Sequence, residues 1–426
     1  MSTGESRTPA RLYVVWLLIV ASLVSWRQGV FYDGGADLVV IAKAACQMTA
    51  LYLAVRALLR SPVRQPMGGA VLLLIGAIIA ISCVGALAAG DTGASWVLSV
   101  RVVLLTLTTA ALIRTYPADL VIRALLTIMG GIGLLSATSG IGEWAAGGRL
   151  AGVVPPLSPN AIAMLCALPA LACLHSILLG RMRLRTTVAF ALLTLILLAT
   201  GSRTALAATL VASLMVFLHM RRLKVSVAVW LITLAPVLFA VLMFSNVVQD
   251  LAIRQDGASI STLNSRTIAW SAVLNTPGDT WQWWIGAGLA VKTVAVKGQY
   301  WEEQVLDSSW ISMLAQSGAL GASLLVLLCL LVVLRSLGAR DLRSLTTPIL
   351  VFVLARSVLE NGLIGDNVMF VVFLTVALAV ERPPAARYGL GTHEDSQLAA
   401  HSEPAASGRL GPWAETDMSY REKAPR

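Results

Sequence analysis

Three arginines and one aspartate are the residues of this sequence whose types and surroundings could support chemistry. Arg203 lies between two apolar runs, in LLTLILLATGSRTALAATLVASLMVF, and its guanidinium group keeps its charge at any ordinary pH. Arg149 and Arg266 lie in polar stretches beside other apolar runs. Because guanidinium groups bind phosphate through charge-assisted hydrogen bonds, these arginines predict recognition of a phosphate-rich group. Asp307, just before a later apolar run, could accept a proton from a hydroxyl group.

The same residues have simpler interpretations, which stay open at this point. A single arginine near the end of an apolar run often extends toward lipid headgroups. Asp307 begins the sequence DSSW before an apolar run, a pattern that is also typical of a helix N-cap. Gly201 permits a sharp turn, and Ser202 could cap the helix that follows, whose amides would then face an anion.

A tryptophan-rich stretch follows Arg266. Arg266, Trp270 and Val273 fall on one helical face, which predicts an amphipathic helix at the membrane interface. The remaining tryptophans of this stretch could form an interfacial belt or stack on sugar rings, and the belt is the simpler interpretation. They are Trp281, Trp283, Trp284 and Trp301.

The elements that must position these residues are membrane helices. The chain has 426 residues, of which 57% are hydrophobic and 13% charged, about half the charge content of a soluble protein. Apolar runs near 20 residues long recur throughout, and they predict an all-α, polytopic transmembrane bundle. We expect about 12 spans, at 12–27, 37–58, 67–89, 95–114, 119–139, 159–179, 186–201, 204–220, 225–245, 308–335, 345–360 and 364–381.

The charges of the connectors predict the topology. Alternate connectors are rich in arginine and should stay in the cytoplasm, whereas those between them are acidic or polar. Both termini are therefore expected inside, and the long segment 246–307 is expected outside, with Arg149, Arg203 and Asp307 on the same face. Residues 1–382 would form the membrane domain, and the polar segment 383–426 a disordered cytoplasmic tail. The net charge of +10 then reflects topology rather than nucleic-acid binding.

Another polar cluster lies in the last predicted outer turn. It consists of Glu360, Asn361, Asp366 and Asn367, with Arg356 one helical turn before Glu360. An Arg356–Glu360 pair at this spacing is most simply structural. A role of the cluster in positioning sugars is the alternative.

Four stretches resemble the O-antigen ligase and polysaccharide polymerase family. They are RLAGVVPPLSPNAIAM, LLATGSRTALAA, SRTIAWSAVL followed by IGAGL, and LDSSWISMLAQSGALGASLLVL, in the family's order and over roughly residues 140–335. The resemblance implies a helical membrane glycosyltransferase that transfers glycan from an undecaprenyl-diphosphate carrier to a sugar hydroxyl. It implies no metal and no other cofactor. The expected partners are that donor, a glycan acceptor and membrane lipids.

The resemblance also implies roles for individual residues. Arg203 and Arg266 match arginines that engage the carrier diphosphate, and Asp307 stands where ligases commonly have the histidine proposed as general base. This departure favours a polymerase over a ligase. Arg149, Asn160, Ser202, Trp270 and Trp310 complete the predicted set, as substrate-binding residues.

Two other classes of protein compete with this hypothesis. A transporter or flippase for a lipid-linked or anionic substrate usually carries ionisable groups near the middle of the membrane. We expect the charges of this chain near the ends of its spans, which argues against that class. A non-catalytic membrane scaffold would leave the arginines without a purpose.

Overall fold

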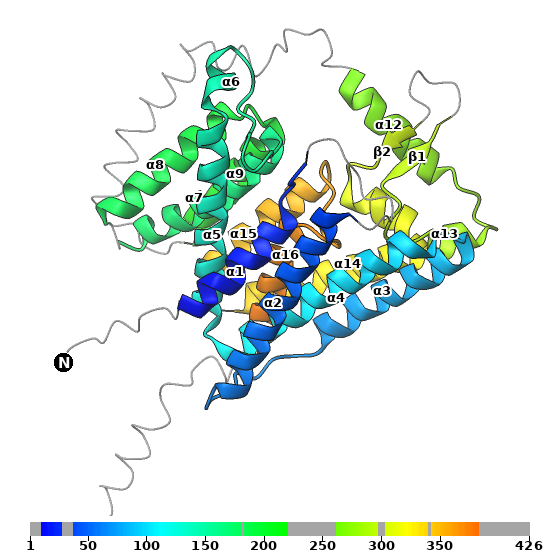
Figure 1. Cartoon of the computed structure of the whole chain (residues 1–426), viewed down its shortest axis with the longest axis horizontal. Helices are drawn as coiled ribbons and strands as arrows, with labels where there is room; N and C mark the ends of the chain where they lie inside the picture. The colour runs from blue at the N-terminus through cyan, green and yellow to red at the C-terminus, as the bar shows by residue number, and fades with distance from the viewer. Residues whose placement is uncertain are drawn as a thin grey trace, which may run out of the picture. The chain divides into compact units, whose positions relative to one another are not determined.

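The computed structural model of the protein describes residues 10–27, 37–180, 183–219, 261–296, 303–339 and 342–382. All of them belong to one compact unit, Met1–Pro383. They are mostly helical, as the apolar runs predict (Figure 1). The predicted span at 225–245 and the predicted tail lie outside the described residues, as does Trp301.

The first part of the chain forms a series of apolar helices. They are α1 (Ala10–Leu23), α2 (Leu38–Arg60), α3 (Ala70–Ala89), α4 (Thr92–Thr115) and α5 (Ala118–Ser139). Asp37 caps α2, because its side chain accepts a hydrogen bond from the Val39 amide. Gly90, in the left-handed conformation, ends α3, so that α4 starts two residues later.

The next helices carry the predicted phosphate-binding turn, and the remaining elements carry Asp307. The first group is α6 (Ile141–Ala145), α7 (Pro159–Leu178), α8 (Leu184–Ala199) and α9 (Arg203–His219). The second group is α12 (Ser261–Leu274), α13 (Trp281–Ile285), β1 (Thr293–Ala295), β2 (Glu303–Val305), α14 (Ser309–Gly338), α15 (Arg343–Ser357) and α16 (Val368–Val380).

Six of the described helices are long and apolar enough to cross a membrane: α2, α3, α4, α5, α7 and α14. Four shorter apolar helices accompany them: α1, α8, α9 and α16. The count of about 12 spans stays a prediction.

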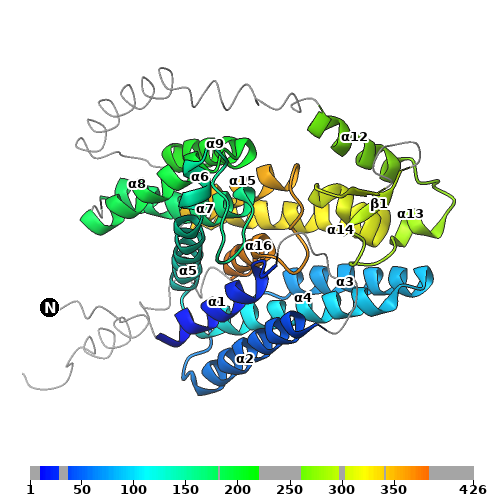
Figure 2. The same cartoon turned by 45° about the horizontal axis from the view of Figure 1, so that its top comes forward.

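Helix α16 lies at the centre of the packing. Every one of its 13 residues is buried, as expected of a helix that is apolar on all sides. Helices α4, α5, α14 and α15 pack against it, and Figure 2 shows it enclosed among them. Its N-cap is Asn367, whose side chain accepts from the Phe370 amide. The polar turn before α16 is therefore anchored to the core.

Close glycine contacts hold the segment before Asp307 against the bundle. Helix α14 is kinked at Gly318, where φ is +64° and ψ is −168°. A Cβ atom on Gly318 would collide with the Trp284 carbonyl group, and one on Gly286 (φ +68°) with the Gln316 backbone. Helix α13 can therefore lie directly on α14 only because both positions are glycine.

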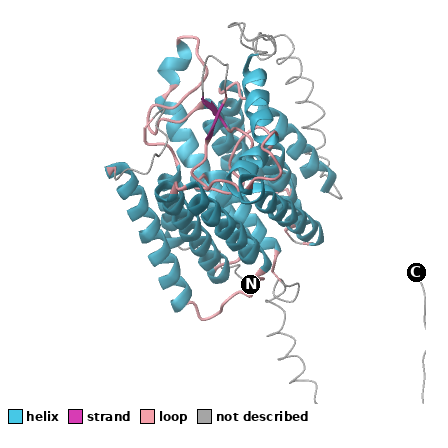
Figure 3. Ribbon diagram, turned by 90° about the vertical axis from the view of Figure 1, so that its right-hand side faces the viewer, coloured by secondary structure: helices cyan, strands magenta, loops and turns pink. Residues whose placement is uncertain are grey.

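Two short strands depart from the predicted all-α fold. β1 and β2 pair antiparallel, with Thr293 opposite Val305 and Ala295 opposite Glu303 (Figure 3). Helix α12 packs against both strands and against α14. The described part of segment 246–307 is therefore a folded unit that ends next to Asp307.

Candidate active site

Asp307 lies between the end of β2 and the start of α14, and it forms an ion pair with Arg266. Its Oδ2 atom accepts from Arg266 Nε at 3.1 Å, and the two side chains are 40% and 26% exposed. Arg266 reaches this position because α12 packs beside β2. The N-cap position of α14 belongs to Ser308, so the interpretation of Asp307 as the helix cap is wrong. Ser308 has the extended backbone of an N-cap residue, and its side chain makes no capping hydrogen bond.

A second polar network joins α7 to the turn after α15. Arg149 Nη2 donates to Asn160 Oδ1 at 3.2 Å, and Asn160 Nδ2 donates to Glu360 Oε1 at 2.8 Å. Arg356 Nη2 donates to the Asn160 carbonyl at 2.8 Å and lies 3.9 Å from Glu360 Oε2. The predicted Arg356–Glu360 pair is confirmed. This network brings Arg149 and Asn160 together, as residues of one site require.

Arg149 also holds the turn that precedes Arg203. Its Nε atom donates to the Thr200 carbonyl at 3.0 Å, and its side chain lies over Gly201, whose φ of +59° favours glycine. Helix α9 begins at Arg203, which is exposed. The Ser202 carbonyl accepts from the Leu206 amide at 2.9 Å. The predicted side-chain cap is wrong, because the buried Ser202 hydroxyl has no partner among the described residues.

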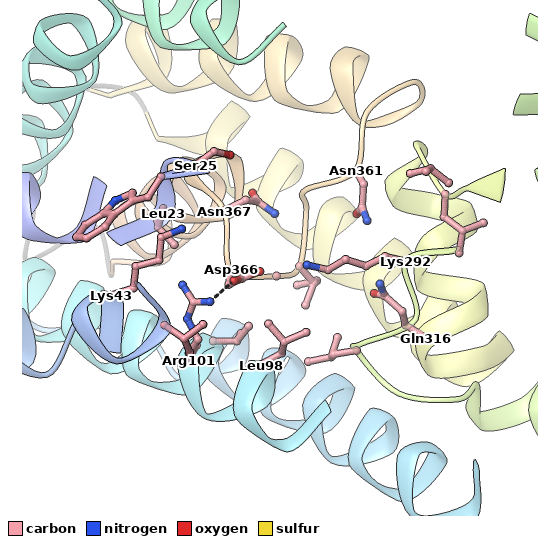
Figure 4. Close-up of a pocket in the computed structure, with 18 of the residues that line it drawn as sticks. Leu23, Ser25, Lys43, Leu98, Arg101, Lys292, Gln316, Asn361, Asp366 and Asn367 are labelled. Atoms are coloured by element: carbon pink, nitrogen blue, oxygen red, sulfur yellow. Dashed lines mark ion pairs between the residues drawn. The ribbon is translucent and has the colours of Figure 1, made fainter. Parts of the chain in front are cut away.

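A cavity of about 560 Å³ opens beside Asp307. Its walls come from α1, α2, α4, α14, the segment that contains the two strands, and the turn before α16 (Figure 4). Asp307 and Glu360 both line it, so the cavity joins the ion pair to the second network. Its other polar or aromatic lining residues are Ser25, Trp26, Arg27, Asp37, Lys43, Arg101, Lys292, Gln316, Asn361, Asp366 and Asn367. The volume is within the range of about 300–1,000 Å³ that is typical of small-ligand sites.

Arg101 and Lys43 were missed in the sequence as parts of the site. Arg101 follows Thr92, the first residue of α4, by nine positions, so it lies about 14 Å along the helix. Its Nη1 atom is 2.6 Å from Asp366 Oδ2, and Figure 4 shows this pair at the cavity. The prediction that charges stay near the ends of the spans is therefore wrong for Arg101. The available signal in the sequence was a single cation inside an apolar run. The same pattern pointed to Arg203.

The Glu360 carboxyl group, which lines the cavity, has a perturbed pKa. Burial raises the pKa of Glu360 above its ordinary value, and Asp307 adds to this effect by repulsion. Arg356 opposes the increase in pKa. A carboxyl group with a raised pKa in a cavity is a candidate for proton exchange with a substrate.

The two tryptophans predicted to bind substrate lie against protein. Trp310 Nε1 donates to Ser357 Oγ at 3.1 Å, and its ring packs against the core. Trp270 packs on the cluster formed by Ala269, Val273 and Leu306, so this face of α12 contacts the strands and α14. Neither tryptophan lines the cavity. Their role in substrate binding stays a prediction.

Of the predicted catalytic residues, the structure brings Asp307 and Arg266 together. Within the described ranges, no hydrogen bond or ion pair joins Arg203 to either of them. Residues 188–326 match the family model of the O-antigen ligase. This match covers about a third of the chain and supports an O-antigen ligase-like family. Together with the six described helices that are long and apolar enough to cross a membrane, the match indicates a multi-pass membrane protein.

The O-antigen ligase match contains Arg203, Arg266 and Asp307. Arg149, Asn160, Glu360 and the cations Lys43 and Arg101 lie outside it, although several of them line the same cavity. No match was found among curated proteins. The site thus combines a family region with residues from the flanking helices.

Proposed function

We propose that this protein transfers glycan from an undecaprenyl-diphosphate-linked donor to a sugar hydroxyl on the outer face of the cytoplasmic membrane. Polymerisation is favoured over ligation, because Asp307 stands where ligases commonly have a histidine. The termini lie in the cytoplasm in this proposal. The O-antigen ligase match supports the class of reaction, since it includes Arg203, Arg266 and Asp307.

The observation that carries the proposal is the position of Asp307. It contacts Arg266 and also lines the cavity. A transferase needs a base beside the acceptor hydroxyl and cationic groups beside the leaving diphosphate. In this proposal Asp307 is the base and Arg266 is one of the cationic groups, and their side chains are in contact.

The reaction can be written as a direct displacement. The acceptor hydroxyl gives its proton to an Asp307 carboxylate oxygen, and the hydroxyl oxygen attacks the anomeric carbon of the donor sugar. The bond from that carbon to the phosphate oxygen breaks, and its electron pair leaves on the lipid diphosphate. Arg266 and Arg203 stabilise the charge that develops there, without a metal ion. Attack opposite the leaving group inverts the anomeric configuration.

The ion pair also lets Arg266 contact the base and the donor together. In the structure Arg266 Nε faces Asp307, and a guanidinium group has further donors for phosphate oxygens. A diphosphate bound to those donors would lie beside Asp307.

The test uses purified protein with an undecaprenyl-diphosphate-linked oligosaccharide. We expect longer glycans and free lipid diphosphate, and a loss of about 100-fold or more in rate for Arg203→Gln and Arg266→Gln. The matched control is Arg185→Gln, an exposed arginine near the other end of the α8–α9 pair, which should keep its activity. Folded variants that retain full activity at both positions would refute the arginine roles.

One observation favours transport as a second candidate function. Lys43 and Arg101 lie within apolar helices and line a cavity, as substrate-coupling groups of transporters do. Uptake of a lipid-linked or anionic glycan into proteoliposomes under an ion gradient would support transport. Glycan extension in detergent, where no gradient exists, would support the transferase.

A further inference from the structure

We propose that the cavity beside Asp307 binds an acidic group, a carboxylate or a phosphate ester, that is carried by the acceptor glycan. The inference rests on the proposed function, because that function assigns the cavity to the acceptor. It adds a substrate class: acidic glycans should be better acceptors than neutral glycans of the same size.

The carboxylates of the cavity are already matched with cations. Each of the four acidic residues in the lining has one arginine within salt-bridge distance. The pairs are Asp37–Arg27 at 2.7 Å, Asp366–Arg101 at 2.6 Å, Asp307–Arg266 at 3.1 Å and Glu360–Arg356 at 3.9 Å. These carboxylates therefore have their counter-charges without the lysines.

Two lysines remain in the lining without such a match. Neither Lys43 nor Lys292 forms a salt bridge with any acidic residue of the described ranges. Arg101 and Lys292 both repel the Lys43 ammonium group, whereas Asp366 attracts it. Figure 4 shows Lys43 and Lys292 entering the cavity from opposite sides, with the Arg101–Asp366 pair between them. An anion placed there would relieve this repulsion.

Arg101 adds a third cation beside the two lysines. Its side chain is only 10% exposed, and its Nη1 atom pairs with Asp366 at 2.6 Å. Because Arg101 lines the cavity, its positive charge would also act on an acidic group bound between the lysines.

The rest of the lining fits a sugar that carries the acidic group. Asn361 and Asn367 present side-chain amides, and Trp26 presents an aromatic ring that is 39% exposed. Amides bond to sugar hydroxyls, and aromatic rings stack on sugar faces. Asp307 lies in the same cavity, so a glycan held by its acidic group could present a hydroxyl to the proposed base.

The experiment compares two trisaccharides that differ only in charge. A trigalacturonic acid and its carboxyl-reduced counterpart are titrated against purified protein in phosphatidylcholine nanodiscs, and binding is measured by calorimetry. We expect the acidic probe to bind about tenfold more tightly, and Lys43→Gln and Lys292→Gln each to remove most of that preference. Lys43→Arg should retain it. Arg60→Gln, which removes an exposed charge from the other end of α2, should leave the preference unchanged.

Three outcomes would overturn the inference. They are equal binding of the two probes, an unchanged preference in the folded lysine-to-glutamine variants, and loss of the preference in phosphatidylglycerol nanodiscs, which would identify a lipid headgroup as the occupant. The proposed function is scored separately by glycan transfer. Selective binding without transfer refutes the transferase and supports the acidic site. Transfer without selective binding supports the transferase and refutes the acidic site.

Discussion

Replacement of Asp307 by asparagine separates a catalytic role of this residue from a structural one. Asparagine has nearly the same shape and can still accept a hydrogen bond from Arg266. It cannot take a proton from a hydroxyl group. The variant therefore removes the proposed base and preserves most of the packing between β2 and α14.

The two roles predict effects of different size. The Arg266–Asp307 pair is 26% and 40% exposed, and such pairs contribute about 0.2–1 kcal/mol to stability. A general base contributes about 10²–10⁴ to rate, which is about 3–5 kcal/mol of transition-state stabilisation. We expect Asp307→Asn to keep its thermal stability within a few degrees and to lose at least 100-fold in transfer rate.

The assay follows glycan extension from a lipid-diphosphate-linked oligosaccharide in detergent, with thermal unfolding measured on the same samples. Asp279→Asn is the matched control, because Asp279 is an exposed carboxylate of the same segment that does not line the cavity. Its rate should equal that of the unmodified protein. A folded Asp307→Asn variant with a rate within about threefold of normal would refute Asp307 as the base.

Three further predictions concern the elements around Asp307. As pH falls, Glu360 should take up its proton above the ordinary value of about 4.3, because burial raises its pKa; the acid limb of the activity profile should lie above that value and move to lower pH in Glu360→Gln. An unchanged limb in Glu360→Gln would assign it to another group. Asn160→Ala should lower the transfer rate about tenfold, because Asn160 joins Arg149 to Glu360, and kinetics indistinguishable from normal would contradict this. Gly286→Ala should lower the unfolding temperature by several degrees, since its Cβ would collide with the Gln316 backbone, whereas Gly278→Ala, with open space around it, should not. Equal thermal stability of the two glycine variants would show that the close contact of α13 with α14 is unimportant.

Apolar periodicity and charge were sufficient to predict most helices. The expected bounds agree with α3, α5 and α7 to within a few residues, because long apolar runs depend little on tertiary context. The three-residue strands β1 and β2 could not be predicted, since so short a ladder forms only where α12 and α14 support it. Local pattern therefore predicts the scaffold better than the segment that carries the site.

Only part of the predicted site comes together in the structure, for a similar reason. Arg266 and Asp307 are 41 positions apart, and their pairing depends on how α12 packs beside β2. Arg101 pairs with Asp366 from a distant part of the chain, and no sequence spacing indicates such a contact. Residue type predicted which groups could act, whereas tertiary packing determines which of them meet.

Glycan transfer by the purified protein is the measurement that tests the central claim most directly. The protein is given an undecaprenyl-diphosphate-linked oligosaccharide in detergent, and both the glycan length and the released lipid diphosphate are followed. The account predicts that glycan extension and lipid-diphosphate release occur together, with an inverted anomeric configuration at the new bond. An active preparation that moves the substrate across proteoliposomes but never releases lipid diphosphate would contradict it.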